Sequence, residues 1–137
     1  MIFGRNKLHR VQGFVMKLLN NHCPDLKGLA DGPRLDRRMN LTLPLLVVPC
    51  EGRRPVIGRI YPALTKELSS TGLSLVAPHT EEATEVVVAI RWEGAMYYLR
   101  ARIRHCTPLG AGFHQLGLEL VEMLNATDYP GLSAVVY

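Results

Sequence analysis

The chain has 137 residues, 47% of them hydrophobic and 20% charged, which is ordinary usage for a folded domain and excludes a disordered chain. A chain of this length suits one domain with a short appendage, and such a domain can bury enough surface to need no disulfide or metal. The apolar runs fall well short of the roughly 20 residues that span a bilayer, and residues 1–7 lack the apolar stretch of a secretory signal. We therefore expect a cytoplasmic protein without membrane insertion.

The formal net charge is +4, which is low for a nucleic-acid-binding protein and argues against such a partner. The distribution of the charge is more informative than its total. Six arginines gather in one stretch of the chain, which favours a compact anionic ligand: Arg34, Arg37, Arg38, Arg53, Arg54 and Arg59.

The first predicted element is an amphipathic helix. Its apolar residues recur at spacings of three and four: Leu8, Val11, Phe14, Val15, Leu18 and Leu19. Pro24 ends the helix because proline cannot continue the hydrogen-bond ladder. A linker with Gly28, Gly32 and Pro33 follows, so residues 1–32 are interpreted as a helix and linker outside the main domain.

From residue 39 the hydrophobic period changes to two, as in strands with one face inward. Pro44 lacks a backbone donor, so the first strand should lie at an edge or carry a bulge there. The remaining predicted strands cover about 56–66, 73–76, 86–92, 96–106 and 113–123, with turns at 69–72 and 93–94 and a loop at 108–112. Six short antiparallel strands predict a mainly β protein, a barrel or a sandwich, over residues 33–124, followed by an irregular or briefly helical tail at 125–137.

Metal-binding and catalytic sites are not indicated. The cysteines Cys23, Cys50 and Cys106 lack a regular spacing, and we interpret them as small, partly buried hydrophobic residues. No glycine-rich phosphate loop, nucleophile elbow or helix-borne zinc motif is present in the sequence. Arg100, Arg102 and Arg104 alternate along one strand and are predicted to form a solvated face. We expect no enzymatic activity and no cofactor.

Two short patterns point to a ligand. The first is Arg34-Leu-Asp-Arg37-Arg38, with two arginines four positions apart just before the first strand. The second is Glu67-Leu-Ser69-Ser-Thr-Gly72, at the turn after the second strand. Guanidinium groups pair with phosphate and with the O6/N7 edge of guanine, while a carboxylate accepts from guanine N1–H and N2–H. Both patterns together would select a guanine nucleotide that carries a phosphate.

The order of these patterns resembles the signature of PilZ domains, which is R-x-x-x-R followed by [D/N]-x-S-x-x-G. The segments Arg38-Met-Asn-Leu-Thr-Leu-Pro-Leu and Gly112-Phe-His-Gln-Leu-Gly-Leu-Glu-Leu also resemble the family's first and last strands. The resemblance covers about Pro33 to Met123. It implies a six-stranded antiparallel β-barrel of the split-barrel type that binds the bacterial second messenger cyclic di-GMP.

Carried over to this sequence, the resemblance implies that Arg34 and Arg38 hold phosphates and guanine edges. It further implies that Ser69 hydrogen-bonds the ligand and that Gly72 shapes the turn, with Arg37 as an accessory contact. Glu67 stands where the family has Asp or Asn. Its extra methylene displaces the carboxylate, so we expect a weaker hydrogen bond between this residue and the ligand.

The resulting prediction is a non-enzymatic receptor or adaptor in the bacterial cytoplasm, acting on an unidentified downstream protein. In it, ligand binding orders residues 28–38 and changes how the N-terminal helix sits on the barrel. Two alternatives remain open. One is a degenerate barrel that binds only proteins, and the other is a small barrel that binds RNA or single-stranded DNA.

Overall fold

The computed structural model describes residues 10, 13–14, 39–40, 42–69, 72–78, 82–129 and 131–137. This part of the chain is an antiparallel sheet, as predicted, with short 3-10 helices in its connections. The strands are β1 (Met39–Asn40), β2 (Pro44–Glu51), β3 (Arg54–Pro55), β4 (Tyr61–Leu68), β5 (Gly72–Ala77), β6 (Glu85–Trp92), β7 (Ala95–Gly110) and β8 (Phe113–Leu124).

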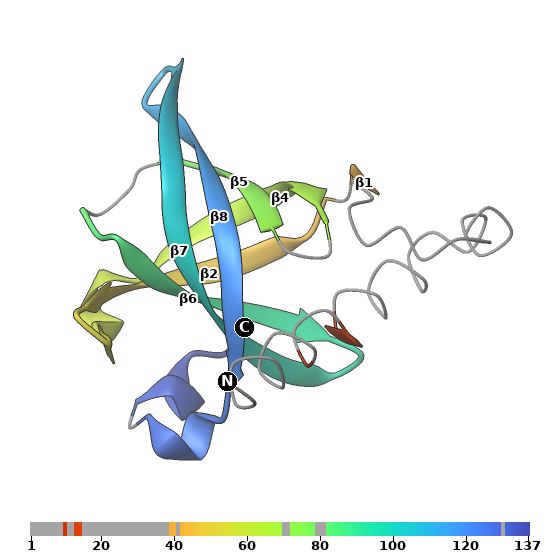
Figure 1. Ribbon diagram of the computed structural model, residues 1–137, viewed down its shortest axis with the longest axis vertical. Helices are drawn as coiled ribbons and strands as arrows, with labels where there is room; N and C mark the ends of the chain where they lie inside the picture. The colour runs from red at the N-terminus through yellow and green to blue at the C-terminus, as the bar shows by residue number, and fades with distance from the viewer. Residues whose placement is uncertain are drawn as a thin grey trace, which may run out of the picture.

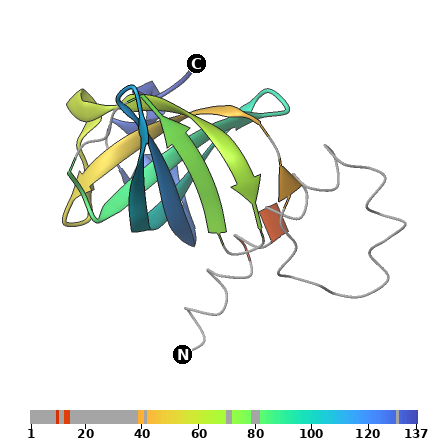
Figure 2. The same ribbon diagram turned by 90° about the horizontal axis from the view of Figure 1, so that it is seen from above.

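Six of these strands form a closed ring in the order β4-β5-β8-β7-β6-β2, because β2 pairs with β4 as well as with β6. The pair that closes the ring matches Pro44 with Leu64 and Val47 with Tyr61. The two-residue strands β1 and β3 extend the ring at β4 and at β2. Figures 1 and 2 show the strands curving around a common interior, with the β7–β8 hairpin projecting beyond the other strands.

The ring interior holds the main hydrophobic core, and the period of two explains how it is filled. Along β5 the buried residues are Leu73, Leu75 and Ala77, and the residues between them are half-exposed. In β8 the inward residues are Leu116, Leu118 and Leu120. This alternation is the pattern from which these strands were predicted.

Several predicted strand limits were wrong. The second long strand begins at Tyr61 rather than near Val56, because a 3-10 helix (Ile57–Arg59) occupies the start of the predicted segment. Pro44 is the first residue of β2, a position that tolerates the missing donor. The predicted loop at 108–112 is mostly strand: β7 continues to Gly110 and a tight turn follows. Beyond Arg102, β6 no longer pairs with β7, so Pro108 lies where β7 is an edge.

The predicted hairpin turn between β6 and β7 is confirmed. Trp92 pairs with Ala95, and two residues connect them. Both connecting residues, Glu93 and Gly94, have positive φ, 50° and 79°, as a type I′ turn requires.

A second hydrophobic core lies on the outer side of β2, β6 and β7, where the C-terminal segment covers the sheet. Leu132 and Val135 are buried there against Val48, Val87 and other apolar residues of these strands. Two 3-10 helices, η3 (Ala126–Asp128) and η4 (Leu132–Ala134), shape this segment. The tail is thus irregular and briefly helical, as predicted, and it belongs to the packed structure.

The prediction that Arg100 belongs to a solvated face was wrong. Arg100 is only 5% exposed, because the tail covers it. Its guanidinium donates to the Tyr129 hydroxyl at 2.5 Å and lies 5.8 Å from the centre of the Tyr129 ring. Arg102 and Arg104 are exposed, as predicted. Tail residues that cover the middle of β7 therefore bury one arginine of the three.

The predicted N-terminal helix and linker lie mostly outside the described residues. Of the helix, the structure describes Arg10, Gly13 and Phe14. Phe14 is buried, packing edge-on against Trp92 with ring centroids 5.8 Å apart and against Tyr97 at 4.6 Å. An aromatic residue from this segment therefore packs against the core inside the ring.

Candidate functional site

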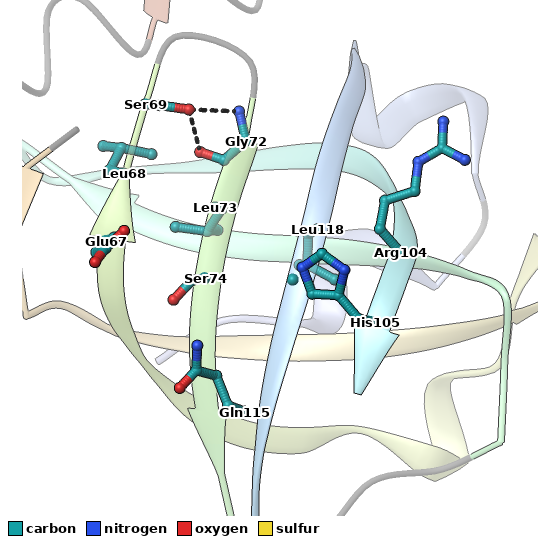
Figure 3. A pocket seen from close by; sticks show the side chains of 11 residues that line it. Glu67, Leu68, Ser69, Gly72, Leu73, Ser74, Arg104, His105, Gln115 and Leu118 are labelled. Atoms are coloured by element: carbon teal, nitrogen blue, oxygen red, sulfur yellow. Dashed lines mark hydrogen bonds between the residues drawn. The ribbon is translucent and has the colours of Figure 1, made fainter. Parts of the chain in front are cut away.

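The turn between β4 and β5 is closed by Ser69 and Gly72, the two motif residues at its ends. The backbone N–H of Ser69 donates to the carbonyl of Gly72 at 2.9 Å. In return, the N–H of Gly72 donates to the Ser69 hydroxyl at 3.0 Å, and that hydroxyl lies 3.3 Å from the Gly72 carbonyl (Figure 3). Residues 70 and 71 lie outside the described residues. The serine side chain is thus held in place by the turn it closes.

Gly72 allows two strands to come close together. A Cβ at this position would lie 3.1 Å from the Leu118 carbonyl oxygen of β8 and 3.5 Å from the Ser69 hydroxyl. The residue does not have the positive φ found at other glycines of this chain. Space, rather than backbone conformation, therefore explains the glycine here.

Glu67 is turned outward by an irregularity in β4. The register against β5 shifts between Thr65 and Glu67, leaving Lys66 as the extra residue. As a result Lys66 and Glu67 are both at least partly exposed, whereas Thr65 and Leu68 on either side are buried. A bulge is a common way to redirect a side chain at a functional position. Lys66 reaches across β5 and donates to the Gln115 side chain at 3.1 Å.

The three described motif residues, Glu67, Ser69 and Gly72, line one open hollow of about 230 Å³. It extends from the end of β4 across β5 and β8 to β7 (Figure 3). Its other lining residues come from all four of these strands: Leu68, Leu73, Ser74, Arg104, His105, Gln115, Gly117 and Leu118.

Arg104 and His105 were not predicted to belong to the site. Both come from β7, which is far from the motif in sequence, and Arg104 was assigned to a solvated strand face. Arg104 is indeed exposed, but it lines the hollow and forms an ion pair with Glu119 of β8. No local pattern around residues 104–105 could have indicated this, because only the order of strands in the ring places β7 two strands from β5, at the far side of the hollow.

Arg34, Arg37 and Arg38 lie outside the described residues. The strand that directly follows them, β1, is described, and it pairs with the end of β4. Met39 lies opposite Leu68, and Asn40 lies opposite Glu67.

The described residues indicate neither a metal site nor a membrane span. Among them, no three His, Cys, Asp or Glu side chains are grouped so that they could hold an ion. Within the same ranges, no helix combines the length and apolar character needed to cross a bilayer.

No family model and no curated protein matches this chain. Among solved structures, it is similar to the Bacillus subtilis inhibitor of motility (MotI/DgrA), with 16% sequence identity and a TM-score of 0.49. The similarity covers 76% of this chain and 48% of that one, so this chain spans less than half of that structure.

Proposed function

We propose that this protein is a non-enzymatic receptor for cyclic di-GMP with a PilZ-like barrel, and that the ligand lies between the Arg34–Arg38 segment and the Glu67–Gly72 turn. The observation that carries the proposal is the pairing of β1 with β4. It sets Met39, the residue after Arg38, opposite Leu68, the residue before Ser69.

Covalent geometry and this pairing together limit the distance between the Cα atoms of Arg38 and Leu68. Consecutive Cα atoms lie about 3.8 Å apart and opposed antiparallel residues about 4.5–5.5 Å apart, so the Cα of Arg38 is within about 10 Å of that of Leu68. A guanidinium on a long side chain can reach the hollow from there. Arg34 is four residues earlier, at most about 14 Å further along the chain.

The chemistry of the hollow suits a guanine nucleotide. Glu67 faces outward beside it and can accept from guanine N1–H and N2–H, a donor pair that adenine lacks. Arginines can pair with the phosphates in bidentate fashion, and the Ser69 hydroxyl at the hollow can hydrogen-bond the ligand. The closed ring of strands supports the barrel that the PilZ resemblance implies. In this proposal the protein acts in the bacterial cytoplasm and takes no metal or cofactor.

Signal output would pass through the N-terminal segment. Phe14 is buried against Trp92 and Tyr97, while the arginine segment lies between Phe14 and β1 in the sequence. Ligand binding at the arginines would change this packing. Hydrogen exchange around Phe14 should differ with and without ligand, and equal protection in both states would remove this part of the proposal.

Titration calorimetry with cyclic di-GMP tests the proposal. We expect micromolar or tighter binding, weakened about 10-fold to 150-fold by Arg34→Ala and by Arg38→Ala, because each removes a charge-assisted contact worth about 1.5–3 kcal/mol. Arg53→Ala is the matched control, since Arg53 is an exposed arginine in the turn between β2 and β3. Absence of binding, or equal weakening by the control, would contradict the proposal.

A second candidate function is protein binding by a barrel that takes no nucleotide. The observation that favours it is an apolar groove of about 370 Å³ between β2, β4 and the C-terminus, in which Leu64, Phe113 and Tyr137 are 48%, 45% and 39% exposed. Exposed apolar surface of this kind often marks a contact site. If the titration shows no binding, this function gains support.

A further inference from the structure

One row of directly opposed residues crosses four strands on the face that carries the hollow. Glu67 of β4 lies opposite Ser74 of β5, Ser74 lies opposite Gly117 of β8, and Gly117 lies opposite His105 of β7. All four residues line the hollow. Because directly opposed residues of neighbouring strands share a face, their side chains form a continuous surface about 14 Å long, which is three strand spacings.

The His105 ring lies on the bare backbone of Gly117. A Cβ at position 117 would be 2.2 Å from His105 Nε2 and 2.3 Å from Cδ2, so the imidazole occupies the space of the missing side chain. No hydrogen bond to another described residue holds the ring. His105 is also exposed, and Figure 3 shows its ring over β8 beside the hollow. The imidazole ring of His105 is thus a flat aromatic surface that rests on Gly117 and is exposed to solvent.

The middle of the row is small. Gly117 has no side chain, and the Ser74 hydroxyl is buried without a hydrogen-bond partner among the described residues. A bulky side chain at position 74 would fill the middle of this surface. Ser74 is small and lies between the His105 ring, which takes the space above Gly117, and the Glu67 carboxylate.

We propose that this row is a base-binding subsite, in which one guanine of the nucleotide stacks on His105 and turns its polar edge toward Ser74 and Glu67. The subsite rests on the function proposed above and adds to it the residue that holds the base. Stacking of a base on an aromatic side chain does not depend on hydrogen bonds, so it can supply affinity where the motif itself supplies only polar contacts.

Calorimetric titration of single variants tests the subsite. His105→Ala should weaken cyclic di-GMP binding about 5-fold to 150-fold, the range expected for losing one base–aromatic stack. His105→Phe keeps a flat ring and should bind within about 3-fold of the wild type. Thr107→Ala is the control, because Thr107 is exposed on the same strand and does not line the hollow.

Gly117→Ala provides an independent test, since the added Cβ must displace the His105 ring. It should weaken binding about as much as His105→Ala, and the double variant should be no weaker than either single one. Should Gly117→Ala fail to fold, the His105 variants still decide the question. Proton NMR gives a second readout: the His105 ring signals, assigned by their loss in His105→Ala, should move upfield when a guanine stacks on the ring.

The outcomes separate the two proposals. If Arg38→Ala weakens binding as expected while His105→Ala binds like the wild type, the receptor function stands and the subsite is wrong. Unmoved His105 signals at saturating ligand would also overturn the subsite. If the wild type does not bind cyclic di-GMP, both proposals fail together.

Discussion

Replacing Ser74 with alanine should stabilise the protein while it weakens ligand binding. The Ser74 hydroxyl is buried and has no hydrogen-bond partner among the described residues. A desolvated, unpaired hydroxyl costs about 1–3 kcal/mol in proteins, and alanine removes it with little change in volume. We therefore expect the free energy of unfolding to rise by about 1 kcal/mol. With roughly 2.1 cal/mol/K of unfolding entropy per residue over 137 residues, this raises Tm by about 3–4 °C.

Ser69→Ala is the matched control, because the same atom is removed from a serine whose hydroxyl is used. The Ser69 hydroxyl accepts the Gly72 N–H at 3.0 Å and helps to close the turn. Its loss should lower the free energy of unfolding by about 1 kcal/mol, so the two serine variants should shift Tm in opposite directions. Scanning calorimetry of the three proteins measures both shifts.

The result that refutes this reasoning is a fall in Tm for Ser74→Ala comparable to that for Ser69→Ala. It would mean that the Ser74 hydroxyl has a partner in solution. Cyclic di-GMP titrations of the same proteins should show weaker binding for both variants. Unchanged affinity of Ser74→Ala would remove Ser74 from the proposed base edge.

Three further predictions concern the tail, the cysteines and the motif carboxylate. Leu132→Ala should lower the free energy of unfolding in urea by about 2–5 kcal/mol, because Leu132 is fully buried in the second core. The control Leu109→Ala replaces a residue that is 49% exposed and should change this free energy by less than about 0.5 kcal/mol. Similar losses for both variants would contradict the structural role of the tail. Burial raises the pKa of the Cys50 thiol to about 11, although the Arg100 guanidinium opposes the shift, so only about one thiol in a thousand is ionised at pH 8. Iodoacetamide should therefore modify the exposed Cys106 well before Cys50, as mass spectrometry can measure. Cys50 should begin to react only as the pH approaches 11. Equal labelling rates of the two cysteines at pH 8 would contradict the burial of Cys50. Glu67→Asp introduces the residue that the PilZ signature has at this position and should tighten cyclic di-GMP binding several-fold. The stability change should be about 0.5 kcal/mol or less because this side chain is partly exposed; weaker binding would mean that the turn is adapted to glutamate.

The proposed site joins two kinds of contact that come from different parts of the chain. The motif supplies charge and hydrogen bonds from the Arg34–Arg38 segment and the Glu67–Gly72 turn. Strand β7 adds Arg104 and His105, whose place in the lining of the hollow depends on the neighbouring β8. An ion pair between Arg104 and Glu119 holds the arginine at the edge of the hollow.

Strands and turns with local signals could be predicted from the amino-acid pattern alone. Alternation of apolar and polar residues located β5 and β8, because a strand with one buried face repeats every two residues. Glu93-Gly94 marked a hairpin because its two positions need positive φ. The turn at residues 69–72 could also be predicted, since it is closed by hydrogen bonds between Ser69 and Gly72, which are only three residues apart in sequence.

Features that depend on contacts between distant segments could not be predicted in this way and became clear from the fold. Arg100 looked like its solvated neighbours, and it is buried because the tail, with Tyr129, covers that part of β7. His105 carried no local signal, and it joins the hollow because β8 pairs with both β5 and β7 and sets Gly117 beneath its ring. A period of two predicts which face a residue takes along its own strand, but not which strand lies beside it or what covers the outer face. Those follow from how the ring closes and where the tail packs.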